Sequence, residues 1–253
     1  MLRRIAFTVA SVLALAATAN AADFGGPSYA VVNWSGFYAG VNAGYGWDAS
    51  SIGSKVTDGL FTYDIQPGGG FGGGQIGYNI QNGNIVYGIE ADIQGSGIED
   101  SVKKSGSYTI VDPSLGVIGT GSATGTAKST LDYFGTVRAR LGYTTGPALI
   151  YVTGGLAYGE ITDEFTGTAT VSAFGLTASG TARTSKTVTP TGWVIGGGAE
   201  QKLFSNLGVK AEYQYIDLGQ DSPWAKLAKE DYAIHTFRVG VNYYFGAANV
   251  PLK

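Results

Sequence analysis

The side chains that could do chemistry in this chain are charged residues at alternate positions of otherwise apolar segments. In one segment, Arg138 and Arg140 alternate with Val137, Ala139 and Leu141. A period of two is typical of a β-strand with one apolar and one polar face. Over all such segments the polar faces carry five acids and five bases, namely Glu90, Asp92, Asp132, Glu200, Glu212, Arg138, Arg140, Lys202, Lys210 and Arg238.

Acids and bases on one face of a sheet predict ion pairs, because an arginine can make forked, charge-assisted bonds to carboxylates. If the sheet closes into a barrel of about eight strands, its interior is only wide enough to be filled by side chains. The first interpretation of the ten residues is therefore a packed charge network along the barrel axis. A conducting pore lined by the same groups is the alternative.

The only histidine, His235, stands at the mouth of the last strand, near Asp231 and Ser222 in the sequence. An enzyme embedded in a barrel would place a catalytic histidine at such a rim. No serine lies two positions from His235 and no convergent pair of acids is evident. A hydrogen bond at the rim is the preferred interpretation.

Other site motifs are weak. Gly68, Gly70 and Gly73 satisfy G-x-G-x-x-G, but no strand-helix-strand unit surrounds them. The loop acids lack a metal-ligand spacing, and the absence of cysteine excludes thiol catalysis and thiolate metal sites. The sequence therefore predicts no catalytic residue, no cofactor and no metal, and the protein is expected not to be an enzyme.

Eight alternating segments must position the charged side chains. The length of each segment is close to that of a tilted membrane strand, which needs about 9 to 11 residues. They span residues 36–47, 72–80, 85–94, 131–143, 149–159, 193–203, 207–218 and 236–245. Short connections (81–84, 144–148 and 204–206) alternate with long ones (48–70, 95–130, 160–192 and 219–234). This interleaving predicts an all-β fold, an eight-stranded antiparallel up-and-down transmembrane β-barrel with short periplasmic turns and long extracellular loops. The second and third long connections are expected to extend their strands above the membrane.

Aromatic residues gather at the two ends of the apolar faces. Rings at headgroup depth are typical of membrane barrels, where they form two girdles. The predicted girdle residues are Phe37, Tyr45, Tyr78, Tyr87, Tyr133, Tyr143, Tyr158, Trp193, Tyr213, Tyr215, Phe237, Tyr243 and Phe245.

The first residues indicate export. Arg3 and Arg4 precede an apolar stretch, 5–17, that is too short to span a bilayer, and Ala19-Asn20-Ala21 supplies a small-x-small cleavage pattern. We predict a signal peptide at 1–21, a periplasmic lead segment at 22–33, the barrel at 34–245 and a periplasmic tail at 246–253.

Composition agrees with a barrel and excludes other classes. The chain has 41 glycines, 16 tyrosines and only 14% charged residues, and without cysteine it cannot be a disulfide-stapled scaffold. Loss of the two signal-peptide arginines leaves 14 basic against 19 acidic residues, a formal charge of −5. This mild acidity gives no electrostatic case for nucleic acid as a partner.

Several stretches resemble a known family. Trp34-Ser-Gly-Phe-Tyr-Ala-Gly-Val-Asn-Ala-Gly-Tyr45, Tyr87-Gly-Ile-Glu-Ala-Asp92, Thr136-Val-Arg-Ala-Arg-Leu-Gly-Tyr143 and the final strand are similar to the small immunogenic porin-family barrels of Gram-negative outer membranes. In architecture these resemble the OmpA transmembrane barrel. The resemblance implies an outer-membrane location, but it implies no single activity, because members are described as structural, porin-like, adhesive, immunogenic or occasionally haem-binding. Members usually end at the last aromatic residue, whereas here residues 246–253 follow Phe245.

Three functions remain open at this point. A structural and surface-interaction protein is preferred, a small diffusion porin is the alternative, and a barrel-embedded lipid-modifying enzyme is third. The expected partners are outer-membrane lipid and lipopolysaccharide, the barrel assembly machinery, and a host or surface ligand at the extracellular loops.

Overall fold

A computed structural model describes residues 32–49, 56–58, 61–63, 68–112, 114, 116–219 and 233–245. No helix in these ranges is long and apolar enough to cross a membrane. The predicted signal peptide, most of the lead segment and the tail lie outside the described residues. The strands are β1 (Gly36–Asp48), β2 (Val56–Asp58), β3 (Phe61–Tyr63), β4 (Gly68–Asn82), β5 (Ile85–Asp112), β6 (Gly116–Thr144), β7 (Ala148–Ala173), β8 (Leu176–Val188), β9 (Thr191–Phe204), β10 (Leu207–Asp217) and β11 (Ala233–Phe245).

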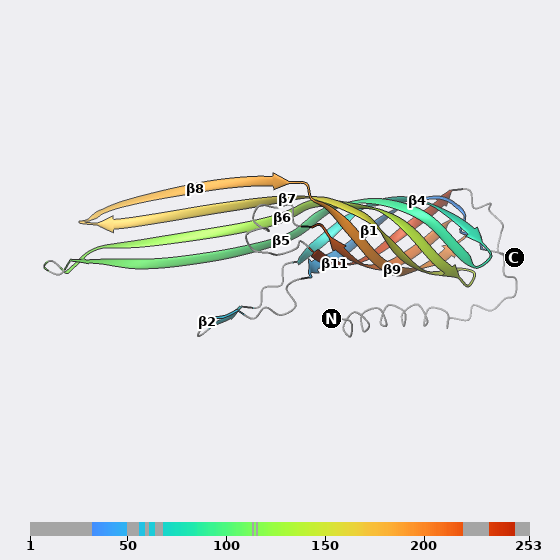
Figure 1. The fold of residues 1–253 in the computed structure, drawn as a ribbon, viewed down its shortest axis with the longest axis horizontal. Helices are drawn as coiled ribbons and strands as arrows, with labels where there is room; N and C mark the ends of the chain where they lie inside the picture. Colours follow the sequence, from blue (N-terminus) through green and yellow to red (C-terminus); the bar gives the residue numbers. More distant parts are fainter. Residues whose placement is uncertain are drawn as a thin grey trace.

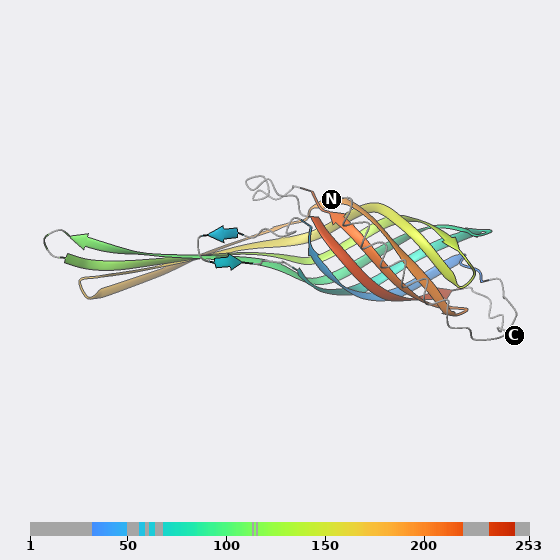
Figure 2. The same cartoon turned by 90° about the horizontal axis from the view of Figure 1, so that it is seen from below.

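Eight of these strands form a closed antiparallel ring (Figures 1 and 2). Their order is β6-β5-β4-β1-β11-β10-β9-β7, and pairing of β6 with β7 closes the ring. The first and last strands are neighbours, with Phe37 opposite Phe245. Closure satisfies the backbone of the wall, where an unpaired polar group in lipid would cost several kcal/mol. The eight predicted segments are these eight strands, so the predicted fold class is confirmed.

Tight turns join the strands at one end of the barrel. Gly83 has a φ of 60° and is the first residue of the two-residue turn between β4 and β5. A glycine with positive φ at this place is typical of a type II′ hairpin turn, which matches the twist of the flanking strands. At the β6–β7 turn, Gly146 has a φ of 96°.

The alternation puts apolar side chains outside the ring and charged ones inside. In β11, Val239 is 51% exposed whereas its neighbour Arg238 is completely buried. The other outward residues of β11 are also apolar or aromatic, including Val241, Tyr243 and Phe245. The outer face of the barrel is therefore apolar and the middle of its interior is charged, as expected for a small membrane barrel.

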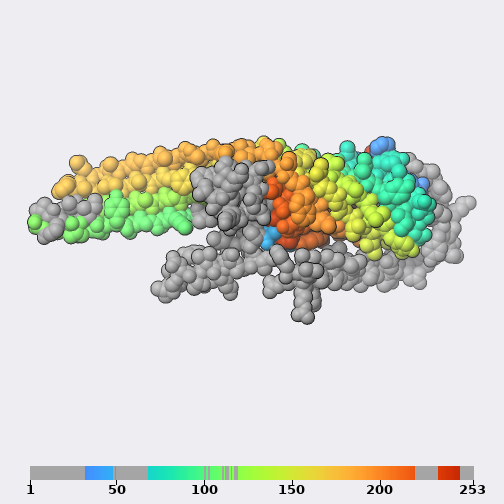
Figure 3. Space-filling model, in the orientation of Figure 1, coloured from blue at the N-terminus to red at the C-terminus, as the bar shows by residue number. Residues whose placement is uncertain are grey.

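Three barrel strands continue far beyond the ring at the opposite end (Figures 1 and 3). β5, β6 and β7 contain 28, 29 and 26 residues, against about 11 needed to span a bilayer. With β8 they make one antiparallel sheet in the order β5-β6-β7-β8, which we call the protruding sheet (residues 99–130 and 160–188). The expectation that the second and third long connections extend their strands is confirmed. A small hairpin of β2 and β3 occupies part of the first connection.

A β-bulge marks the place where β6 passes from the barrel to the protruding sheet. The register between β6 and β7 shifts there, with Leu131 opposite Ile161 and Tyr133 opposite Glu160. The extra residue, Asp132, is exposed and accepts a hydrogen bond from the Thr162 hydroxyl at 2.6 Å. The prediction that Asp132 faces the barrel axis is wrong, because a bulge changes which side chains point inward.

Candidate functional site

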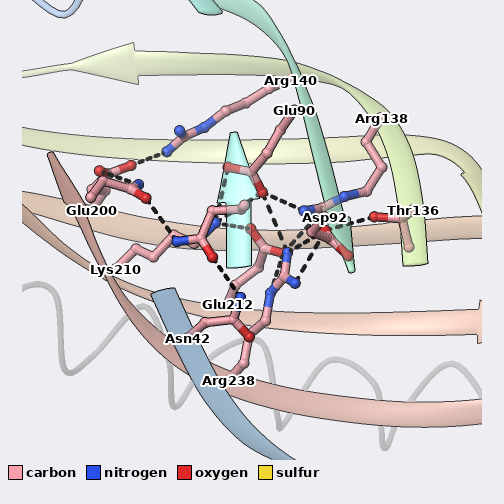
Figure 4. Close-up of polar contacts among 12 residues, drawn as sticks. Asn42, Glu90, Asp92, Thr136, Arg138, Arg140, Glu200, Lys210, Glu212 and Arg238 are labelled. Atoms are coloured by element: carbon pink, nitrogen blue, oxygen red, sulfur yellow. Dashed lines mark hydrogen bonds and ion pairs between the residues drawn. The ribbon is translucent and has the colours of Figure 1, made fainter. Parts of the chain in front are cut away.

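A group of six charged side chains fills the middle of the barrel (Figure 4). Every member lies on the inward face of its strand and is at most 5% exposed. The group, which we call the central network, consists of Glu90, Asp92, Arg138, Lys210, Glu212 and Arg238. Its three acids balance its three bases.

Both arginines of the central network contact all three carboxylates. Arg138 donates to Glu212 at 2.6 Å and to Asp92 at 2.8 Å, and it also bonds Glu90. Arg238 donates to Glu212 at 2.6 Å, to Asp92 at 3.2 Å and to Glu90 at 3.4 Å. Since each buried charge would cost several kcal/mol on its own, this mutual neutralisation is what allows the six groups to share the interior.

Lys210 completes the central network from the β10 side. Its Nζ lies 2.9 Å from each carboxylate oxygen of Glu90 and 4.0 Å from Glu212. The Thr136 hydroxyl donates to Asp92 at 2.7 Å. The carboxylates thus bond to side chains from strands on opposite sides of the ring, so the network connects the barrel wall across its axis.

A second ion pair lies nearer the tight turns. Arg140 donates to Glu200 at 2.6 Å, and its guanidinium stacks on the ring of Tyr151 at 3.6 Å. The other oxygen of Glu200 accepts from Asn242 at 2.8 Å and from the Tyr244 hydroxyl at 2.7 Å.

Two tyrosines connect this pair to the central network. The Tyr151 hydroxyl donates to Glu212 at 2.6 Å and the Tyr38 hydroxyl to Glu90 at 2.8 Å. The alternation of their strands puts Tyr38, Tyr151 and Tyr244 on the inward face, where all three are buried, but nothing in their spacing predicts that they join a network.

The barrel end with the tight turns is capped by an aromatic cluster. Trp34 is completely buried, and its indole N–H donates to the Thr144 hydroxyl at 2.9 Å and to the Gly146 carbonyl at 3.0 Å. Lys202 donates to the Asn33 carbonyl at 2.7 Å and lies 4.1 Å from the Tyr244 ring. These contacts hold Trp34, which precedes the first strand, at the mouth of the barrel, and no pattern in the sequence predicts this position.

The opposite end of the lumen is filled by an apolar cluster. Phe71 and Phe134 meet edge to face with their ring centroids 5.2 Å apart. Around them pack Ile98, Leu131, Ala157, Ile161, Val194, Ile216 and Leu218. The barrel axis therefore passes through three layers, an aromatic cap, a charged middle and an apolar layer.

Of the ten residues predicted to face the lumen, nine are buried inside the ring and Asp132 is not. The buried set is four acids and five bases. Lys202 differs from the rest, because its ammonium group donates to the main-chain carbonyls of Asn33 and Ser205.

The predicted girdle residues all lie on the outer face. At the tight-turn end Phe37 packs against Tyr78 with centroids 4.7 Å apart. At the other end Trp193 packs against Tyr215 at 5.4 Å. The thirteen rings range from half-buried to exposed, which fits side chains that meet lipid rather than a ligand inside the barrel.

His235 belongs to the outer aromatic surface, where it contacts other aromatic side chains. Its Nδ1 is 2.6 Å from the Tyr213 hydroxyl. The imidazole stacks on Trp47 at 5.8 Å and lies 5.2 Å from the Tyr215 ring. Asp231 and Ser222 lie outside the described residues. The glycines of the G-x-G-x-x-G pattern fall within β4.

The protruding sheet has two different faces. Residues directly opposite each other in neighbouring strands share a face. One face has rows of hydroxyls in which Thr168 lies 3.3 Å from Thr181 and Ser172 lies 2.8 Å from Thr177, oxygen to oxygen. Three successive rows of this face contain only serine and threonine, namely Ser105, Thr124, Thr168 and Thr181, then Ser107, Ser122, Thr170 and Ser179, then Thr109, Thr120, Ser172 and Thr177.

The other face of the protruding sheet is built mainly from glycine, alanine and a few large apolar side chains, and Lys104 and Lys186 also lie on it. A Cβ at Gly121 would meet the Tyr108 ring, and a Cβ at Gly125 or Gly167 would touch the ring of Phe165. Nearer the barrel, on the hydroxyl face, Lys128 donates to Glu99 at 2.8 Å, and this bond raises the pKa of Lys128 above its ordinary value.

Comparisons with known proteins find similar chains among bacterial outer-membrane proteins. A chain from Brucella melitensis, the 31 kDa outer-membrane immunogenic protein, is 36% identical over 228 residues, which cover 84% of each chain. The 22 kDa outer membrane protein of Rhizobium leguminosarum is 31% identical over 186 residues, covering 73% of this chain and 64% of that one. Among solved structures, Ail of Yersinia pestis aligns over 83% of this chain and 99% of its own, with 15% identity and a TM-score of 0.36.

The family described as "Outer membrane protein beta-barrel domain" matches residues 7–245. This match spans the whole ring of strands. The chain belongs to the outer-membrane β-barrel protein family and is a protein of the bacterial outer membrane.

Proposed function

We propose that this protein is a closed membrane anchor with a structural and surface-interaction role, which holds the protruding sheet away from the cell surface. The observation that carries the proposal is the filled lumen. Trp34 and its neighbours occupy one end, the central network occupies the middle, and Phe71 and Phe134 occupy the other end. A barrel of eight strands has room for such a filling and little more.

The partners follow from the surfaces. The two aromatic girdles would contact outer-membrane lipid and, in the outer leaflet, lipopolysaccharide. The barrel assembly machinery would insert the closed ring. A host or surface ligand would meet the protruding sheet, whose strand β8 is exposed along nearly its whole length. The similar Brucella protein is named an immunogenic protein, and this name is compatible with a sheet displayed at the cell surface.

A small diffusion porin is the second candidate, and one observation favours it. The side-chain amides of Asn79 and Gln94 and the hydroxyl of Thr153 are buried without a hydrogen-bond partner among the described residues. Buried polar groups of this kind are commonly satisfied by ordered water. Water beside the network is compatible with a closed barrel, whereas a porin needs a continuous path, so recordings of ion conductance separate the two functions.

A lipid-modifying enzyme is the third candidate. His235 would be its catalytic residue, and the contacts of this imidazole with Tyr213, Trp47 and Tyr215 place it in the aromatic surface. We expect His235→Ala to leave the lipid A pattern of producing cells unchanged. An altered pattern would support the enzyme and contradict the structural role.

The proposed function is tested by shortening the protruding sheet without opening the barrel. Residues 102–127 and 165–184 would each be replaced by Asn-Gly, since Val102 pairs with Ala127 and Phe165 with Thr184. We expect the variant to keep the shift in gel mobility on heating that marks a folded barrel. Adhesion of producing cells to serum-coated plates should fall to that of cells without the protein. Full adhesion at equal amounts of folded protein would overturn the proposal.

A further inference from the structure

The protruding sheet ends in an edge strand whose outer side pairs with no strand among the described residues. β8 pairs only with β7, from Leu176 opposite Ala173 to Val188 opposite Ile161. All its residues except the last are exposed. An edge of this length presents a row of backbone N–H and C=O groups to which another chain can add.

Hairpin geometry determines which residues of β8 point their backbone N–H and C=O groups away from β7. Phe174 and Gly175 both have positive φ, 52° and 79°, as in a type I′ turn. The residues that flank such a turn, Ala173 and Leu176, exchange hydrogen bonds, and the bonded pairs then alternate along the ladder. The backbone groups that point to the open side therefore belong to Thr177, Ser179, Thr181, Arg183, Ser185 and Thr187.

Side-chain contacts support this assignment. In antiparallel pairs that do not exchange backbone bonds, the side chains stand closer together. Thr177 and Thr181 lie 2.8 Å and 3.3 Å, oxygen to oxygen, from their opposite residues Ser172 and Thr168. These are the pairs that the turn geometry leaves without mutual backbone bonds.

The edge of β8 has neither the β-bulge nor the proline with which sheets often block further pairing. Its register with β7 is continuous from end to end, so no bulge twists it away. Its sequence, Leu-Thr-Ala-Ser-Gly-Thr-Ala-Arg-Thr-Ser-Lys-Thr-Val, contains no proline. Only Arg183 and Lys186 are charged, and both are cations. The edge is open and carries one sign of charge.

The two cations give the edge a chemical preference. Arg183 and Lys186 are three residues apart, so they project from opposite faces of the sheet. On the β7 side of β8, Glu164 lies diagonal to Arg183, and Asp163 lies directly opposite Lys186. A strand on the outer side would meet both cations directly and would be favoured by carboxylates at the matching positions. A second copy of β8 would instead bring two more cations to the same ribbon.

We propose that the open edge of β8 binds an extended acidic polypeptide segment, which adds to the protruding sheet as an antiparallel strand. Two carboxylates separated by two residues face Arg183 and Lys186, and small or β-branched residues flank them. This inference rests on the proposed surface-interaction role and specifies its partner.

The test is a fluorescence-anisotropy titration of the full chain in detergent micelles. The probe is a labelled peptide, Thr-Val-Thr-Asp-Val-Thr-Asp-Val-Thr-Val, and the control peptide has lysine in place of both aspartates. We expect the acidic peptide to bind at least about tenfold more tightly than the lysine peptide, as expected when two modest attractions become repulsions. Equal binding of the two peptides would overturn the charge preference.

A proline substitution tests the edge itself. Thr181→Pro removes an outward N–H and no bond to β7, so the hairpin is retained. It should reduce binding of the acidic peptide at least about tenfold, because the incoming strand loses a ladder bond and meets the proline ring. Unchanged affinity in Thr181→Pro would place the peptide elsewhere and overturn the proposal.

Charge reversal supplies a matched comparison. Arg183→Glu with Lys186→Glu should exchange the preference between the two peptides, whereas Lys103→Glu with Lys104→Glu on β5 should leave it unchanged. Equal effects of both double variants would contradict a site on β8.

If the chain without peptide forms dimers that Thr181→Pro abolishes, a second copy is the occupant and the acidic segment is not. Absence of peptide binding would leave the closed barrel and the adhesion test untouched, so the two proposals fail separately.

Discussion

Arg138 and Arg238 share one acceptor, because each guanidinium lies 2.6 Å from Oε1 of Glu212. They come from β6 and β11, which do not pair in the ring. Two like charges can meet there only because Glu90, Asp92 and Glu212 surround them. The balance of charge in the central network is thus a condition of the fold.

Removal of one shared donor should destabilise the barrel. Arg138→Ala leaves three carboxylates facing Arg238 and Lys210, and uncompensated buried charge typically costs about 3–5 kcal/mol. We expect a lower midpoint of urea unfolding in micelles and a lower temperature for the shift in gel mobility. Arg183→Ala, on the exposed edge strand, should change the free energy of unfolding by no more than about 0.5 kcal/mol. An unchanged midpoint for Arg138→Ala would show that the central network does not stabilise the barrel.

The aromatic cap can be separated into its packing and its hydrogen bonds. Trp34→Ala should cost about 3–5 kcal/mol of unfolding free energy through the cavity that it creates. Trp34→Phe keeps most of the packing and loses the bonds to Thr144 and Gly146, so its cost should be about 1–3 kcal/mol. Chemical unfolding in micelles measures both. Trp193→Ala, on the outer face, is the matched control, and an equal loss there would argue against a special role for Trp34.

The turn between β7 and β8 contains a strained residue. Phe174 has a φ of 52°, a left-handed conformation that costs a residue other than glycine about 1–2 kcal/mol. Phe174→Asn creates the Asn-Gly pair preferred in type I′ turns. Hydrogen exchange of the β7–β8 amides should slow several-fold in this variant. Faster exchange would indicate that the Phe174 ring stabilises the hairpin.

The periodic part of the structure was predictable from the sequence, and the irregular part was not. Alternation in β11 placed Arg238 inward and Val239 outward because a closed membrane sheet imposes that pattern on every residue. Asp132 broke the rule, since the bulge beside it depends on pairing with β7, which no local pattern reveals. Trp34 precedes the first strand, so the alternation of inward and outward residues does not predict where its side chain lies. The strand β8 alternates hydroxyls with small residues, so its hydrophobic signal is weak.

The most direct test of the closed-anchor account is ion conductance of the purified, heat-modifiable full chain in a planar lipid bilayer. A known large porin added to the same bilayer afterwards serves as the positive control. With the aromatic cap, the central network and the apolar layer in place, we predict a silent baseline until the control protein is added. Steady, reproducible conductance steps from the folded monomer would contradict the account and establish the porin.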